Sequence, residues 1–212
     1  SEDFFNTKLF TGNYRFVFLS MLHESHLGIY RRKRDGAKVV FGEAAYPLTD
    51  EKYYDDYIEG RVFTSGCAFN RKFLKWFADN YEFCGHTRTD ELRENLLTIL
   101  SHLNKDTTLV LMLGVEYPCA ANTNPAFSQS HVVFREHNEM IRQLSQENSR
   151  IKYIYYGDFL NGQDGFFNNI YHFTPEVYYK VAGRICDYLN VNQADKKEVS
   201  IASQNKIKIV QL

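Results

Sequence analysis

Segments with the length and composition of β-strands alternate with segments of helical periodicity along most of this chain. Four strands are expected after residue 60, at 61–65, 81–84, 108–113 and 151–156. Four helices are expected with them, at 70–80, 90–103, 136–148 and 174–189. Such alternation is typical of a parallel sheet with crossover helices on both faces. The sequence therefore predicts an α/β fold, a three-layer sandwich with a mainly parallel central sheet.

The first 60 residues have a different pattern, which predicts a β-rich N-terminal extension. Residues 13–22 have strand composition, and 27–30 and 37–41 flank Asp35-Gly36, a signal for a type I′ hairpin. The basic run 31–34 is expected at the solvated tip of this hairpin. We therefore divide the chain into an extension at 1–60, an α/β core at 61–190 and a C-terminal segment at 191–212.

The C-terminal segment contains two short alternating runs, 198–202 and 206–210. They are expected either to pair as a terminal hairpin or to lie along a sheet edge.

Composition bounds the function classes. The chain has 212 residues, 44% of them hydrophobic, and a formal net charge of −1. It can bury a sizeable core. Because its acidic and basic residues nearly balance, it has no overall positive potential that would attract nucleic acid. Without a signal peptide or an apolar run of membrane-spanning length, we expect a cytoplasmic protein. Because the chain begins at Ser1 without Met, covalent fusion to a missing domain is also considered.

Metals and cofactors have no motif in the sequence. The four cysteines lack Cys-x-x-Cys spacing, and the histidines form no His-Glu-x-x-His pattern. Neither a Gly-x-G-x-x-G turn nor a Walker lysine motif is present. We therefore expect no metal site and no cofactor.

A histidine near the C-terminus is the strongest candidate for chemistry. His172 follows the apolar strand at 151–156 and precedes a helix for which Thr174 is a plausible N-cap and Pro175 the first residue. Asn169 lies three residues before His172. An imidazole in this position is expected on a loop at the carboxyl edge of the sheet.

These residues resemble the last conserved block of the SGNH/GDSL hydrolase family, whose catalytic Asp and His lie three residues apart before a C-terminal helix. The resemblance implies an SGNH/flavodoxin-like fold with His172 as general base. Asn169 stands at the family's Asp position; its amide can orient the imidazole but brings no charge to stabilise an imidazolium. Asp158 and Asp164 are alternative partners for His172.

The family's nucleophilic serine follows its first core strand. In this chain the equivalent turn, after the expected strand 61–65, contains Ser65 and Cys67. Ser65 is the positional candidate for the nucleophile, and Cys67 is its rival in the same turn, although the family's Gly-Asp-Ser order is absent. Small residues that simply fill a tight turn are the alternative interpretation.

The resemblance also implies an oxyanion hole after the most hydrophobic strand, at 108–113. Gly114 matches the glycine of the family's Gly-x-Asn pattern, whereas Glu116 replaces its asparagine. Asn122 and Asn124 follow in the same loop and could supply an amide to the substrate instead. A carboxylate aimed at a developing oxyanion would oppose catalysis.

We therefore hypothesise ester hydrolysis or acetyl or acyl transfer on an acylated carbohydrate or a similar polar substrate. Two alternatives remain open. One is a non-catalytic SGNH-like module that binds a glycan or a protein partner within a bacterial-type polysaccharide-assembly protein. The other is a transferase that uses Glu116 and His172 as acid and base.

Overall fold

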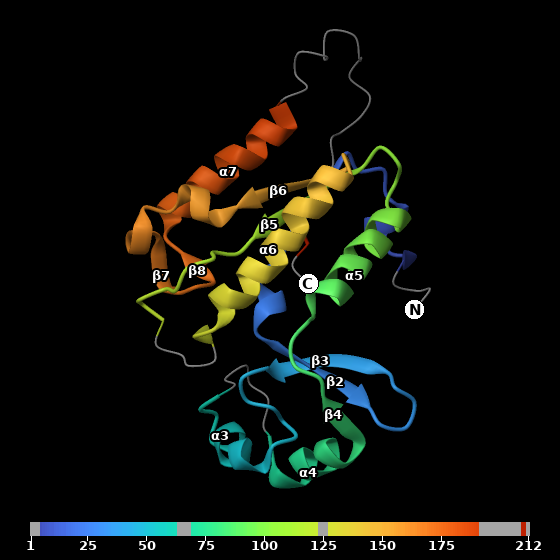
Figure 1. Ribbon diagram of the computed structural model, residues 1–212, viewed down its shortest axis with the longest axis vertical. Coiled ribbons are helices and arrows are strands. Elements are labelled where there is room, and N and C mark those ends of the chain that lie inside the picture. The colour runs from blue at the N-terminus through green and yellow to red at the C-terminus, as the bar shows by residue number, and fades with distance from the viewer. Residues whose placement is uncertain (1–4, 63–68, 123–126, 191–208, 211–212) are drawn as a thin grey trace.

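The computed structural model describes residues 5–62, 69–122, 127–190 and 209–210, and it has an α/β fold (Figure 1). Its main sheet has the strand order β6-β5-β1-β9. The strands are β1 (Phe16–Ser20), β5 (Thr108–Leu113), β6 (Ile151–Tyr155) and β9 (Ile209–Val210). Every pairing in this sheet is parallel. The predicted α/β class and the parallel character of the sheet are therefore confirmed.

Both faces of the sheet are buried, which explains why its strands are continuously apolar. In β5, Leu109 and Leu111 join one hydrophobic cluster, and Val110 and Met112 join the cluster on the opposite face. Helices α5 (Thr89–His102) and α6 (Ser130–Glu147) contribute to the first cluster. Helix α7 (Pro175–Asn190) packs on the second. The helices thus form one layer on each side of the sheet (Figure 1).

The sheet begins earlier in the chain than the expected boundary at residue 60. Strand β1 lies between β5 and β9, with Phe16 opposite Thr108 and Ser20 opposite Met112. Residues from the expected N-terminal extension therefore supply an interior strand of the core. The partner β5 follows after a long insertion, so the pairing leaves no local signal in the sequence.

That insertion forms a small antiparallel unit beneath the main sheet (Figure 1). It contains β2 (Leu27–Arg32), β3 (Lys38–Glu43) and β4 (Tyr81–Phe83) in the order β3-β2-β4. Its helical segments are η2 (Glu51–Tyr53), α3 (Tyr54–Ile58) and α4 (Arg71–Asn80). A separate aromatic-rich cluster, which includes Tyr30, Tyr57 and Phe77, holds it together. The expected strand 81–84 thus joins this antiparallel sheet rather than the parallel one.

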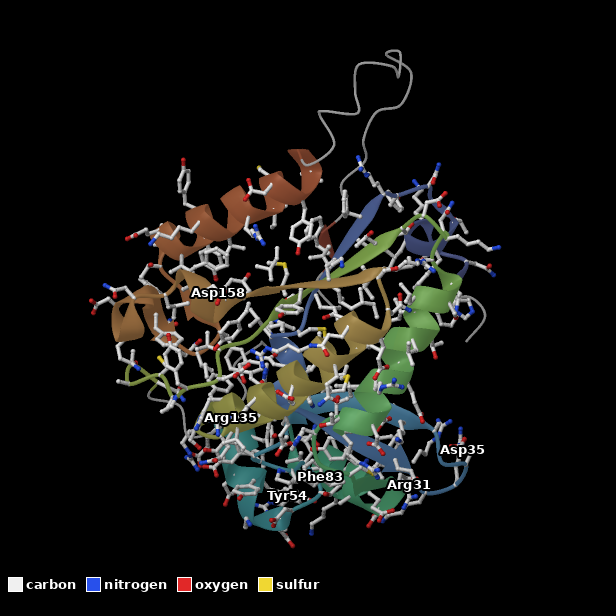
Figure 2. The ribbon with its side chains drawn as sticks, turned by 45° about the horizontal axis from the view of Figure 1, so that its top comes forward. Arg31, Asp35, Tyr54, Phe83, Arg135 and Asp158 are labelled. Atoms are coloured by element: carbon white, nitrogen blue, oxygen red, sulfur yellow. The ribbon has the colours of Figure 1, made fainter. Side chains whose placement is uncertain are left out.

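The β2–β3 hairpin is present as predicted, but its turn is not type I′. Among the described residues only glycines have positive φ, and Gly36 has φ of 74°. A type I′ turn would need positive φ at Asp35 as well. Instead, the Asp35 carboxylate accepts from Nε and Nη2 of Arg32, at 2.8 and 2.7 Å. Arg31, also near the hairpin tip (Figure 2), pairs with Glu82.

The remaining short elements connect these units. They are α2 (Lys8–Thr11), η1 (His23–Ser25), η4 (Tyr156–Phe159), η5 (Gly162–Gly165), β7 (Phe166–Asn169) and β8 (His172–Phe173). Strand β9 lies along β1 at the sheet edge, one of the two arrangements expected for the C-terminal runs. The run 198–202 lies outside the described residues. No helix in the described part of the chain is both long and apolar enough to cross a bilayer.

Candidate functional site

The carboxyl edge of the parallel sheet gathers most of the candidate residues. Strands β1, β5 and β6 run in the same direction, so the segments that follow them meet at this edge. They are η1 after β1, the loop from Gly114 after β5, and η4 after β6. The β7–β8 hairpin lies at the same end, just before α7 (Figure 1). Open parallel sheets bind their ligands at this edge.

His172 is exposed on the β7–β8 hairpin, and its imidazole is held by a neighbouring amide. Its Nδ1 lies 2.8 Å from Oδ1 of Asn168. Nδ1 carries a proton when it donates this bond, so in the neutral form of the ring the lone pair is on Nε2. Nδ2 of Asn169 lies farther from Nδ1, at 3.3 Å. The hairpin therefore presents an imidazole whose orientation is held by a side-chain hydrogen bond.

Asn169 has a different role from Asn168 in the same turn. Its Oδ1 accepts from the backbone N–H groups of Tyr171 and His172, at 2.8 and 3.1 Å. This is the local side-chain to backbone bonding that makes asparagine common in turns. Asn169 thus shapes the hairpin, and the shorter bond to the ring comes from Asn168, for which no sequence pattern predicted a role.

Three other candidates lie outside the described residues: Ser65, Cys67 and Asn124. Their roles stay predictions. Asn122, at the end of a described segment, donates its backbone N–H to the carbonyl of Cys119 at 3.2 Å. Asp158 in η4 and Asp164 in η5 are both exposed. In the part of the chain that the structure describes, neither shares a hydrogen bond with His172.

Gly114 is buried where β5 ends. A Cβ at this position would lie 2.5 Å from the ring of Phe134, which belongs to α6. The carbonyl of Gly114 accepts from Nδ2 of Asn138 at 2.8 Å. Close packing of α6 against the strand end is therefore sufficient to require glycine here.

Glu116 is tied to helix α6. Its Oε1 accepts from Asn138 Nδ2 at 2.8 Å and from Arg142 Nη2 at 2.5 Å. The Glu116 carbonyl accepts from Arg135, which Figure 2 shows on α6, at 3.1 Å. The carboxylate is thus charge-balanced and fastens the loop after β5 to the helix.

A hydrogen-bonded cluster at the same edge was not predicted. The Ser25 hydroxyl, in η1, lies 2.9 Å from the Tyr171 hydroxyl, which also bonds Ser130 at the start of α6. The His26 ring centroid is 4.7 Å from that of Tyr171 and 5.4 Å from that of His23. The only sequence signal was the serine and histidine pattern directly after the strand at 13–22.

Burial keeps His26 and Tyr171 uncharged near neutral pH. Desolvation by burial, and to a smaller extent the charge of His23, lowers the pKa of His26 to about 4. Desolvation raises the pKa of Tyr171 to about 12. Both groups are therefore neutral, and in each bond between Tyr171 and a serine either hydroxyl can be the donor.

Replacing Tyr171 with Phe should lower the free energy of unfolding by about 1–3 kcal/mol, because the buried hydroxyls of Ser25 and Ser130 lose a partner. Urea denaturation measures this change. The matched control is Tyr179→Phe, since Tyr179 is 81% exposed and its loss should matter by less than about 0.5 kcal/mol. Equal stability of the two variants would contradict the role of the cluster.

Glu43, at the end of β3, should make stability depend on pH. It is 7% exposed, its Oε2 has no hydrogen-bond partner among the described residues, and burial raises its pKa from 4.5 to about 7. Between these values the folded protein keeps a proton that the unfolded chain releases. This contribution to stability is therefore complete below pH 4.5 and is lost as pH rises to about 7, by up to about 3 kcal/mol.

Urea denaturation of wild type and Glu43→Gln across this range tests the effect. His26 has the opposite influence, because its lowered pKa makes stability rise between about 4 and 6.5. The difference between the two proteins isolates Glu43. The same pH dependence in both would contradict the prediction.

No group of three His, Cys, Asp or Glu side chains within the described ranges is arranged to hold a metal ion. Comparisons with protein-family models, with curated proteins and with solved structures found no match. The functional conclusion therefore depends on the residues and their arrangement.

Proposed function

We propose that this protein is an SGNH-like esterase or acyltransferase that acts on an acylated carbohydrate or a similar polar substrate. The observation that carries the proposal is the orientation of His172. Its exposed ring donates from Nδ1 to Asn168, so Nε2 is available to take a proton at the carboxyl edge of the sheet. A general base needs this combination of access and fixed tautomer.

In the proposed reaction His172 Nε2 accepts the hydroxyl proton of the nucleophile as its oxygen attacks the acyl carbonyl. The imidazolium then returns the proton to the departing sugar oxygen, which leaves an acyl-enzyme. Water or a second sugar hydroxyl attacks this ester, and the same imidazole again removes and returns the proton. Asn168 orients the ring but adds no charge, so its stabilisation of the imidazolium is modest.

Ser65 is the proposed nucleophile on the sequence resemblance alone, because it lies outside the described residues and the first strand of the parallel sheet is β1 rather than the expected strand at 61–65. Ser25 is the second candidate, because it follows β1, the first strand of the parallel sheet. It is, however, only 6% exposed, and its hydroxyl is already bonded to Tyr171. The assignment therefore favours Ser65.

Aromatic side chains on the elements that flank His172 suit a carbohydrate. Phe167 in β7 is 69% exposed and Tyr179 in α7 is 81% exposed. Exposed rings of this kind can pack on the C–H face of a sugar, and a tyrosine hydroxyl can also form hydrogen bonds. These two rings offer such packing surfaces to a glycan-like substrate.

Hydrolysis of p-nitrophenyl acetate and of acetylated xylo-oligosaccharide, with acetate release as the readout, tests the proposal. Wild type should turn over at least one substrate, Ser65→Ala should not, and Ser25→Ala should keep the activity. Full activity of Ser65→Ala would overturn its assignment. A folded wild type inactive on both esters would favour the non-catalytic binding module.

A further inference from the structure

A groove of about 400 Å³ follows β6, the edge strand of the parallel sheet. This volume is within the usual range of small-molecule sites. The groove extends from α6 across β6 and η4 to α7. Its charged and phenolic side chains are those of Lys152, Tyr153, Tyr155, Asp158, Arg184 and Tyr188. Figure 2 shows Asp158 where β6 has ended, beside α7.

Among the residues that the structure describes, the charges of two cationic side chains in the groove are not balanced by a carboxylate at close range. Lys152 is exposed, and within the described residues its ammonium group forms neither an ion pair nor a hydrogen bond. Arg184 approaches a carboxylate only at 3.9 Å, that of Asp187, and its guanidinium lies 5.6 Å from the ring centroid of Tyr188. Both groups can therefore form charge-assisted bonds with an anionic ligand.

The edge of β6 is partly closed to a peptide strand. The Tyr188 hydroxyl donates to the backbone carbonyl of Tyr153 at 3.2 Å. A peptide that extended the sheet would need this carbonyl as an acceptor for its own N–H. Tyr188 therefore disfavours a ligand that pairs with the backbone of β6 and favours one that contacts the side chains of the groove.

We propose that this groove binds an acidic carbohydrate chain, one that carries sugar carboxylates. Lys152 and Arg184 would bind the carboxylates, and the tyrosine rings would pack against sugar C–H faces. The Asp158 carboxylate can accept from sugar hydroxyls, whereas it would repel a dense anion such as a polyphosphate. The mixture of two cations, one carboxylate and three phenols matches a ligand that is both anionic and rich in hydroxyls.

Isothermal titration calorimetry with a galacturonic acid trisaccharide tests this site. Wild type should bind it, and Lys152→Gln and Arg184→Gln should each weaken the affinity by about three- to tenfold. The matched control is Lys180→Gln, which removes the same charge from α7 at a lysine that pairs with Glu176 and does not line the groove. It should bind like wild type.

Neutral maltotriose should bind at least threefold more weakly than the acidic trisaccharide, and inorganic phosphate should not displace the latter. The proposal is overturned if the acidic trisaccharide does not bind, if maltotriose binds equally well, if phosphate displaces the acidic ligand, or if both groove variants bind like wild type. Because this experiment measures binding, its result decides the proposal for the groove independently of whether His172 supports ester turnover.

Discussion

His172→Ala should lower the rate of ester turnover by about two to four orders of magnitude, the usual contribution of a positioned general base. The ring is exposed, so its removal should leave the melting temperature nearly unchanged. Nε2 is the proposed proton acceptor because Nδ1 is engaged by Asn168. The quantity to measure is kcat/KM for the acyl ester that wild type hydrolyses.

The partner of the imidazole gives this prediction a finer test. Asn168→Asp would place a carboxylate 2.8 Å from Nδ1, where it can stabilise the imidazolium, and should raise kcat.

His102→Ala is the control for His172→Ala, because His102 is an exposed histidine on α5 that forms its hydrogen bond within its own helix. Turnover by His172→Ala equal to that of His102→Ala would refute the general-base role.

Phe134→Ala should lower the free energy of unfolding by about 3–5 kcal/mol, the range for truncating a buried aromatic side chain. Phe134 is 1% exposed, and its ring covers Gly114 so closely that a Cβ there would lie 2.5 Å from it. The ring also meets Tyr171 edge-on, with centroids 5.7 Å apart. Its loss would open a cavity between α6 and the end of β5.

Chemical denaturation of Phe134→Ala and of Val132→Ala measures the effect. Val132 belongs to the same helix and is 37% exposed, so its truncation should change stability by less than about 0.5 kcal/mol. Similar losses in the two variants would show that Phe134 does not hold the strand end and would remove the packing explanation for Gly114.

Local pattern was enough for most elements of the core. The run 108–113 is apolar at nearly every position because both faces of β5 are covered, and it was predicted with the observed ends. Helix α6 begins before its expected start at 136, since Val133 and Phe134 already pack on the core. Strand pairing was beyond reach, because β1 is separated from β5 by the antiparallel unit.

In the candidate site, too, only local features could be predicted from the sequence. The location of His172 shortly before helix α7 was predicted, because Pro175 indicates where that helix begins. The exchange of roles between Asn168 and Asn169 was not, because it depends on which side chain the turn aims at the ring. Ser25 and Tyr171 lie 146 positions apart in sequence, so only the fold reveals that their hydroxyls meet.

Labelling with a fluorophosphonate probe, followed by mass spectrometry of the peptides, tests the proposed ester chemistry most directly. We expect one covalent adduct on wild type, on the peptide that contains Ser65, and loss of that adduct in His172→Ala. A folded wild-type protein that takes up no probe, or an adduct that persists at full rate without His172, would contradict it.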